Sequence, residues 1–288
     1  MTGYEALRNR AAWLDLSARG KIKLTGEDRA RLLHAMTTNH IQQLTPGSGC
    51  YAFFLNDKGR VLADANILCR PDYFLLDVEP ETREPLYQHL DRFIIADDVT
   101  LEDVTDSTAT IAVEGPEAAS VLERAGAPVP EADYASVEWD SALVARLNAT
   151  GSAGFFIFAP AVEKQALISR LEAAGAVCAD AEAARVVRLE HGKPRYGEDI
   201  SERFLAQEAN QPQALHFSKG CYLGQEIVER VRSRGQIHRV LKPLTLETHE
   251  PPEPGTKLES GTTPGAEITS AAYSPALGKV VALAYVRK

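Results

Sequence analysis

The chain has 288 residues, of which 44% are hydrophobic and 25% are charged, and its formal net charge is −9. A chain of this length and composition builds a hydrophobic core of its own, which excludes a disulfide-rich peptide and wholesale disorder. The acidic balance argues against general affinity for nucleic acid or for an anionic membrane. The cysteines are scattered without zinc-type spacing, and neither a signal peptide nor a membrane-spanning run is recognisable, so we expect a cytoplasmic protein without a metal site.

The first third of the chain predicts strands and helices in alternation. Alternating apolar and polar residues indicate strands, and apolar residues three or four positions apart indicate helices. Three of the strands follow one another and predict a meander, with a turn at the Asn-Asp-Lys-Gly stretch of residues 56–59. The expected elements are the strands Lys21–Leu24, Cys50–Leu55, Arg60–Cys69 and Tyr73–Val78, and the helices Glu27–Met36 and Glu81–Phe93.

The middle of the chain predicts the order strand, helix, strand, strand, helix, strand. Pro116 stands in the first turn of one helix, where proline is tolerated, and Gly126 and Gly175 follow the two helices. This order is typical of a ferredoxin-like split βαβ unit. The expected strands are Thr110–Val113, Ala142–Leu147, Gly154–Ala159 and Ala176–Ala179, and the expected helices are 115–126 and Val162–Ala174.

The last fifty residues consist of short apolar runs separated by Gly/Pro turns. Regularly spaced short strands with such turns predict a small β-barrel or sandwich. The runs are Val240–Leu246, Lys257–Glu259, Ala266–Ala272 and Val280–Val286.

The stretch from Phe217 to Gly235 contains a cysteine beside an expected helix. Apolar residues from Leu223 onward fall on one helical face, and Gly235 is placed to end the helix. Cys221 then lies at or just before the helix N-terminus, two residues after Lys219. Free backbone N–H groups and a nearby ammonium both favour the thiolate, which makes Cys221 a candidate nucleophile or sulfur ligand. The alternative is that Cys221 is a small buried hydrophobic residue, as free cysteines commonly are.

Glu190 lies near the end of a helix expected over Ala181–Leu189. A carboxylate at that end is unfavourable with respect to the helix dipole and needs a partner. One possibility is a surface ion pair with Arg188, Lys193 or Arg195. The other is a ligand that offers two parallel N–H donors to the carboxylate.

Asp64 interrupts an apolar, strand-like run. A carboxylate in such a run is costly unless it is paired or exposed. Strict alternation places Asp64 and Asn66 on one face of the strand and Ala63 and Ala65 on the other. Two interpretations stay open, a solvated strand face and a functional carboxylate.

Several of these motifs resemble one known family. The K-G-C-Y-L-G-Q-E stretch of residues 219–226, followed by Arg230 and Gly235, resembles the K-G-C-Y-x-G-Q-E motif of the YgfZ-type folate-binding proteins. These proteins are relatives of the T-protein (aminomethyltransferase) of the glycine cleavage system. Residues 56–64 resemble the family's strand with an acidic end, residues 188–197 its folate-side motif and residues 268–275 its C-terminal barrel, so the resemblance runs through the chain.

The resemblance implies an α+β, multidomain T-protein-like folate-binding fold with a ferredoxin-like module and a small C-terminal β-barrel. Its first domain would be discontinuous and would comprise residues 1–105 plus 183–236. The ferredoxin-like domain would span residues 106–182 and the barrel residues 237–288. The three modules would surround a central hole that holds tetrahydrofolate.

The resemblance also implies a role as a tetrahydrofolate-binding accessory protein in iron–sulfur cluster assembly or repair. Cys221 would be the functional thiol and Lys219 would tune it, and the partners would be iron–sulfur client or assembly proteins besides reduced folate. Glu190 would anchor the pterin, and Asp64 would lie near the N5/N10 region of the folate. Further expected site residues are Asn66, Tyr222, Gln225, Glu226 and Arg230.

Two alternatives come from other classes. The first is a folate-dependent one-carbon (aminomethyl) transferase of the T-protein type, for which Asp64 and Glu190 are suited but which leaves the cysteine motif unexplained. The second is a hydrolase or acyltransferase with Cys221 as nucleophile, for which the sequence shows no evident base. Whether the protein is an enzyme stays open at this stage.

Overall fold

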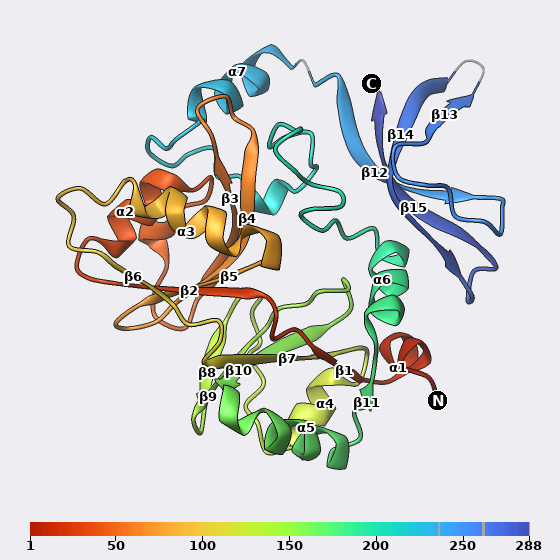
Figure 1. Cartoon of the computed structure of the whole chain (residues 1–288), viewed down its shortest axis with the longest axis horizontal. Helices are drawn as coiled ribbons and strands as arrows, with labels where there is room; N and C mark the ends of the chain where they lie inside the picture. Colours follow the sequence, from red (N-terminus) through yellow and green to blue (C-terminus); the bar gives the residue numbers. More distant parts are fainter. Residues whose placement is uncertain (236, 261–262, 288) are drawn as a thin grey trace.

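The structure is a computed structural model that describes residues 1–235, 237–260 and 263–287. Within these residues the strands form three sheets, of five, six and four strands. Figure 1 shows the five-stranded sheet with its helices on the upper left, the six-stranded sheet below it and the four-stranded sheet on the upper right. None of the described helices has the length and apolar character needed to cross a membrane.

The five-stranded sheet is built from the first hundred residues in the order β3-β4-β5-β2-β6. β3, β4 and β5 are neighbours, which confirms the predicted meander. The turn between β3 and β4 forms because the Asn56 side chain accepts hydrogen bonds from the backbone of Lys58 and Arg60, while Gly59 supplies a φ of 68°. The strands are β2 (Gly20–Thr25), β3 (Gly49–Leu55), β4 (Val61–Cys69), β5 (Phe74–Val78) and β6 (Thr100–Asp103).

Helices cover one face of this sheet. Leu33 and Leu86, from the two α-helices, are buried against apolar residues of the strands. The opposite face, which carries Phe53 and Asp64, is turned toward the rest of the molecule. The covering elements are α2 (Arg29–Met36), α3 (Arg83–Asp91) and the 3-10 helices η1 (Ile41–Gln43) and η2 (Pro80–Thr82).

The six-stranded sheet does not confirm a separate ferredoxin-like module. The expected strands and helices are present, but an unpredicted strand, β8, precedes β9, and the sheet runs β11-β1-β7-β10-β9-β8. The N-terminal strand β1 lies between β11 and β7, because Ala12 pairs with Val177 on one side and with Glu114 on the other. The elements are β1 (Ala12–Asp15), β7 (Thr108–Glu114), α4 (Ala118–Arg124), β8 (Ser136–Trp139), β9 (Ala142–Ala145), β10 (Gly154–Pro160), η3 (Ala161–Glu163), α5 (Lys164–Ala173) and β11 (Val177–Cys178).

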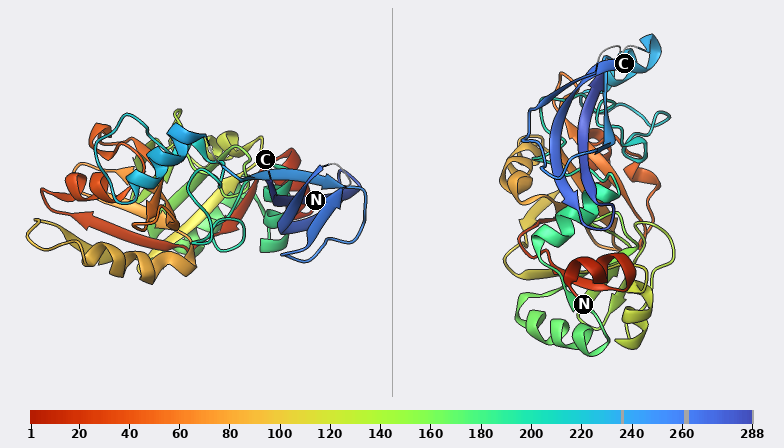
Figure 2. Two further views of the ribbon diagram at one scale, coloured as in Figure 1. Left: turned by 90° about the horizontal axis from the view of Figure 1, so that it is seen from above. Right: turned by 90° about the vertical axis from the view of Figure 1, so that its right-hand side faces the viewer.

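Two helices, α1 (Gly3–Asn9) and α6 (Ala181–Glu190), lie between the six-stranded and the four-stranded sheets, as the right-hand view of Figure 2 shows. α1 has no counterpart among the predicted elements. It begins with a capping box, in which Thr2 and Glu5 each accept a hydrogen bond from the other's backbone N–H. α6 matches the predicted helix and starts at Asp180, whose side chain caps it.

The C-terminal sheet is open, which corrects the barrel prediction. Its order is β12-β15-β14-β13, and in the described residues β12 and β13 are edges that do not pair with each other. One of its faces is covered instead of being closed into a barrel, since Tyr285 stacks on Phe204 with ring centroids 3.7 Å apart. The strands are β12 (Arg239–Leu246), β13 (Lys257–Ser260), β14 (Thr263–Ser274) and β15 (Lys279–Arg287).

Between α6 and β12 the chain returns to the five-stranded sheet. Phe204 and Ile200 pack against Phe53 and Val61 in one buried cluster, and the Val61 N–H donates to the carbonyl of Phe204 at 3.2 Å. This segment includes η4 (Pro212–Ala214) and α7 (Gln225–Arg234). The boundaries of the three expected domains stay a prediction.

Candidate functional site

A cavity of about 380 Å³ lies where these parts of the chain meet. Its size is in the range of small-molecule binding sites. Its walls come from the open face of the five-stranded sheet, from the loop 148–150 and neighbouring residues of the six-stranded sheet, and from α6 with the loop that follows it. The polar and aromatic residues that line it include Arg19, Tyr51, Asp64, Asn66, Glu79, Tyr134, Asn148, Phe156, Arg185, Arg188, Lys193, Arg195, Glu198, Gln211 and Gln213.

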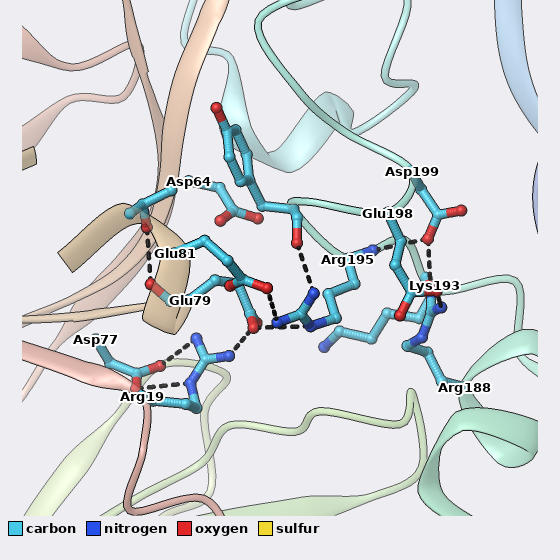
Figure 3. Close-up of polar contacts among 12 residues, drawn as sticks. Arg19, Asp64, Asp77, Glu79, Glu81, Arg188, Lys193, Arg195, Glu198 and Asp199 are labelled. Carbon is cyan, nitrogen blue, oxygen red and sulfur yellow. Dashed lines mark hydrogen bonds and ion pairs between the residues drawn. The ribbon is translucent and has the colours of Figure 1, made fainter. Parts of the chain in front are cut away.

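Arginine–carboxylate pairs form most of the charged wall (Figure 3). Arg19 binds Asp77 through Nε at 2.8 Å and also pairs with Glu79. Arg195 reaches Glu79 from the other side, with Nε 2.9 Å from the carboxylate. Glu79 is therefore shared by two guanidinium groups, and their charges lower its pKa although burial alone would raise it.

A second group of pairs lies on the α6 side of the cavity. Arg188 donates to Asp199 at 2.6 Å and to Glu198 at 2.8 Å. Arg185 also lies 3.4 Å from Glu198. All four arginines of the cavity wall are thus neutralised by carboxylates, and they hold the wall in place without presenting a free charge.

Among the described residues, Asp64 is the carboxyl of the cavity wall without a cationic partner; Asp15 pairs with Lys164, and Glu79 and Glu198 pair with arginines. Its side chain is buried, and its partner is the hydroxyl of Tyr51, which donates to Oδ2 at 2.6 Å. In the described residues no Lys, Arg or His nitrogen lies within 4.0 Å of it. Burial, and then the charge on Glu79, raise the pKa of Asp64 to about 6, although the Tyr51 hydrogen bond and the charge on Arg19 act in the opposite direction.

Asn66 also lines the cavity, two residues along β4 from Asp64. Its amide donates to Asp77 at 2.8 Å, so its nitrogen is tied to the arginine pairs. The structure therefore brings the two predicted residues of this strand to one site. Of the two interpretations of this face, the solvated one is wrong for Asp64, because only 8% of that residue is exposed.

Glu190 lies outside the cavity. Its carboxylate accepts hydrogen bonds from Tyr4 at 2.6 Å and from Ser274 at 2.5 Å, and it pairs with Arg8. Only 4% of the side chain is exposed. The ion-pair partner is therefore an N-terminal arginine and not Arg188, Lys193 or Arg195, and the observed role of Glu190 is to join α1, α6 and β14.

Cys221 lies outside the cavity as well, on the loop before α7. Its thiol is free and exposed, so the buried alternative is wrong. α7 begins at Gln225 with Gly224 as its N-cap, which places Cys221 three residues before the cap and not at the helix terminus. The chain cannot enter the helix earlier, because Gly224 has a φ of 83° and packs so closely that a Cβ there would lie 2.6 Å from the carbonyl oxygen of Asn56.

Lys219 attaches this loop to the end of α2. Its buried ammonium donates to the carbonyl of His34 at 2.6 Å and to the carbonyl of Thr37, and it lies 4.7 Å from the centroid of the Tyr222 ring. These carbonyls lack a partner within the helix, so the lysine completes its C-terminus. Burial lowers the pKa of Lys219 to about 7. An influence of this ammonium on Cys221 stays a prediction.

The remaining predicted site residues surround α7. Tyr222 is buried in the cluster beneath the C-terminal sheet, and Gln225 is the first residue of the helix. Glu226 and Arg230 pair on its exposed side. None of the four is among the residues that line the cavity. In the described residues no group of three or more His, Cys, Asp or Glu side chains is arranged to hold a metal ion.

The arginine pairs were not predicted, although a signal for one of them exists. Arg19 directly precedes β2 and Glu79 directly follows β5. The two strands pair in antiparallel register, with Gly20 opposite Val78, so residues 19 and 79 meet at the same end of the sheet. Oppositely charged residues at the ends of two expected neighbouring strands therefore indicate a pair.

Comparisons with known proteins agree with this architecture. An aminomethyltransferase from Rubrobacter xylanophilus is 31% identical over 98% of this chain and 78% of its own length. One from Streptomyces coelicolor is 30% identical over 98% of this chain and 80% of its own length. The crystal structure of glycine cleavage system aminomethyltransferase T from Bartonella henselae matches 99% of this chain and 80% of that chain with a TM-score of 0.90 at 22% identity, which confirms the T-protein-like α+β fold. The family model of the GCVT N-terminal domain matches residues 2–219, and the chain belongs to this family.

Proposed function

We propose that this protein is a folate-dependent one-carbon transferase of the aminomethyltransferase type, with the central cavity as its folate site. The relatives named above are aminomethyltransferases and match nearly the whole chain. The observation that carries the proposal is Asp64, a buried cavity carboxyl without a cationic partner whose pKa is raised to about 6. A carboxyl of this kind is suited to proton transfer near neutral pH.

The cavity suits tetrahydrofolate in size and in chemistry. Its volume of about 380 Å³ is appropriate for a ligand with two rings and a tail. Tyr51, Tyr134 and Phe156 offer aromatic surface to a flat ring system. The side-chain oxygen of Gln213 offers a hydrogen bond to its polar edge, and Gln211 holds the nitrogen of this amide at 2.8 Å. We expect these residues to hold the ligand.

Bound tetrahydrofolate would supply the amine nitrogen that accepts the one-carbon group. The chain's own residues would accept a proton from that nitrogen or stabilise a positive charge beside it. Ionised Asp64 can accept a proton or stabilise a neighbouring cationic centre, and no protein cation competes for it within 4.0 Å in the described residues. The Tyr51 hydroxyl fixes the orientation of Oδ2.

Titration with tetrahydrofolate and an assay of formaldehyde-equivalent transfer onto it test the proposal. Asp64→Asn keeps the shape of the side chain and removes its proton chemistry, so transfer should fall by about 100-fold or more while folate binding persists. Asp72→Asn alters an exposed carboxylate and serves as the matched control. Transfer by Asp64→Asn at the rate of the control would refute the assignment.

A second candidate is the YgfZ-type accessory role in iron–sulfur cluster assembly or repair. The observation that favours it is Cys221, an exposed thiol on a loop whose backbone is attached to α2 by Lys219 and by the bond from Leu223 N–H to the Ala35 carbonyl at 3.0 Å. The transferase chemistry leaves this thiol unused. In a deletion strain, Cys221→Ala should fail to restore the activity of cluster-dependent enzymes, and full restoration would exclude a role for the thiol.

A further inference from the structure

Lys193 is the one cation of the described cavity wall without an acidic partner. Its ammonium contacts neutral oxygens, the backbone carbonyl of Asn148 and the side-chain oxygen of the same residue at 2.6 Å. In the described residues no carboxylate lies within 4.0 Å of it. An ammonium has three N–H donors, so one of them is left without a protein partner. Figure 3 shows that no dashed line joins this ammonium to any of the carboxylates drawn, in contrast to the arginines around it.

The fold directs Lys193 to the cavity. α6 ends in a Schellman motif, in which Gly192 has a φ of 64° and its N–H donates to the carbonyl of Leu189, while the Lys193 N–H donates to the carbonyl of Arg188 at 3.0 Å. The Arg188 guanidinium donates in return to the Lys193 carbonyl at 2.8 Å. The backbone of Lys193 is thus fixed on both sides, and its side chain lines the cavity.

The nearest competing charges do not neutralise Lys193. Burial lowers its pKa, and among the charges that act against this lowering Glu114 ranks first, ahead of Asp64 and Glu79. The carboxylate of Glu114 is already hydrogen-bonded to the loop 148–150. It accepts from the backbone N–H of Ala149 at 2.5 Å and of Thr150 at 2.9 Å. Glu79 is held by two arginines. The positive charge of Lys193 therefore remains available to a ligand.

We propose that Lys193 binds a carboxylate group of the ligand in the cavity. The cavity then offers one carboxyl without a cationic partner, Asp64, and one ammonium without an acidic partner, Lys193, which together complement a ligand that carries an amine and a carboxylate. The carboxylate has two possible sources, the glutamate of the folate itself or a separate small amino acid. This inference rests on the proposed function, since the proposed function supplies the ligand class.

Affinities of Lys193→Gln for three probes test the proposal, measured by isothermal titration. The probes are tetrahydrofolate, tetrahydropteroate, which has no glutamate, and glycine added to the folate-saturated protein. Lys242→Gln removes an exposed lysine of β12 and is the matched control. Lys193→Arg keeps the charge and should retain affinity, and circular dichroism checks that each variant folds.

Two results support the proposal and name the source. If the carboxylate is the folate glutamate, Lys193→Gln weakens tetrahydrofolate binding about 10- to 100-fold and leaves tetrahydropteroate binding unchanged. If it belongs to an amino acid, both folates bind as in the wild type, and glycine binds the wild type but not Lys193→Gln.

Other results overturn the proposal. Equal loss for both folates would show that Lys193 contacts the pterin half of the ligand and not a carboxylate. No change with any probe would show that its charge is unused. Failure of the wild type to bind both folates would refute the proposed function alone if glycine, titrated without folate, binds the wild type but not Lys193→Gln, and failure to bind any probe would refute both.

Discussion

The buried carboxyl of Asp64 predicts a pH-dependent stability difference between the wild type and Asp64→Asn. In the folded protein the pKa of Asp64 is about 6, above its ordinary value of 3.8, because the ionised form loses hydration and faces Glu79. A group whose folded pKa is raised contributes stability that is complete below the unfolded pKa and is lost as the pH rises through the folded one. Each pKa unit corresponds to about 1.4 kcal/mol, so ionised Asp64 costs the wild type about 3 kcal/mol at pH 8.

Asparagine at position 64 carries no charge at any pH and still accepts the hydrogen bond from Tyr51. The free energy of unfolding of Asp64→Asn relative to the wild type should therefore rise by about 2.5 kcal/mol between pH 4 and pH 8, because part of the cost is already present at pH 4. Urea unfolding followed by circular dichroism at both pH values measures this difference. Tyr51→Phe is the matched comparison. It removes a hydrogen bond that lowers the pKa of Asp64, so the wild-type transition should move to higher pH.

The reasoning would be refuted by a difference between Asp64→Asn and the wild type that stays constant within about 0.5 kcal/mol across this range. Such a result would mean that Asp64 is hydrated in the folded protein or paired with a cation. Either condition would also remove the reason for assigning it a proton-transfer role. The stability measurement thus tests the site without a substrate.

The other predictions concern the cavity wall and the start of α7. Arg19→Met should destabilise the protein by about 3–5 kcal/mol in urea unfolding, because it leaves Asp77 and Glu79 buried without this partner; a loss below about 1 kcal/mol would show that the pairs are solvated. Gly224→Ala should lower the melting temperature more than Gly278→Ala, since a Cβ at 224 meets Asn56 and Leu55 while one at 278 meets nothing within 4 Å. Equal losses would mean that only the positive φ matters.

Most of the strands and helices could be predicted because their apolar spacing is a local property. β1 could not, since its four residues are too few for a period and its place between β11 and β7 depends on two partners distant in the chain. The start of α7 was misplaced by its apolar pattern, which includes Leu223, because the close packing of Gly224 on Asn56 is not visible in the sequence.

In the candidate site, too, residues with a local sequence signal could be predicted and residues that depend on tertiary contacts could not. Asp64 could be identified from the sequence because burying a carboxylate within an apolar strand carries a desolvation cost, whatever the surrounding tertiary structure. The position of Glu190 at the end of a helix could be predicted, but its partners could not, because Tyr4 and Arg8 are 186 and 182 residues away. From the sequence, Lys193 is only a possible ion-pair partner of Glu190. Lys193 stands out only because the fold pairs the neighbouring arginines with carboxylates and leaves this ammonium without one. Such pairing depends on contacts between residues distant in the sequence.

The C-terminal sheet supports the cavity wall, although none of its described residues lines the cavity and it lies beyond the part that the family model matches. Asp199 accepts hydrogen bonds from Thr269 at 2.6 Å and from Ser270 at 2.5 Å, both on β14, and its other oxygen accepts from Arg188. Arg188 in turn lines the cavity and holds the backbone of Lys193. The unpaired lysine is therefore positioned by a chain of buried contacts that begins in β14. The charge that the cavity offers to a ligand depends on the docking of this sheet.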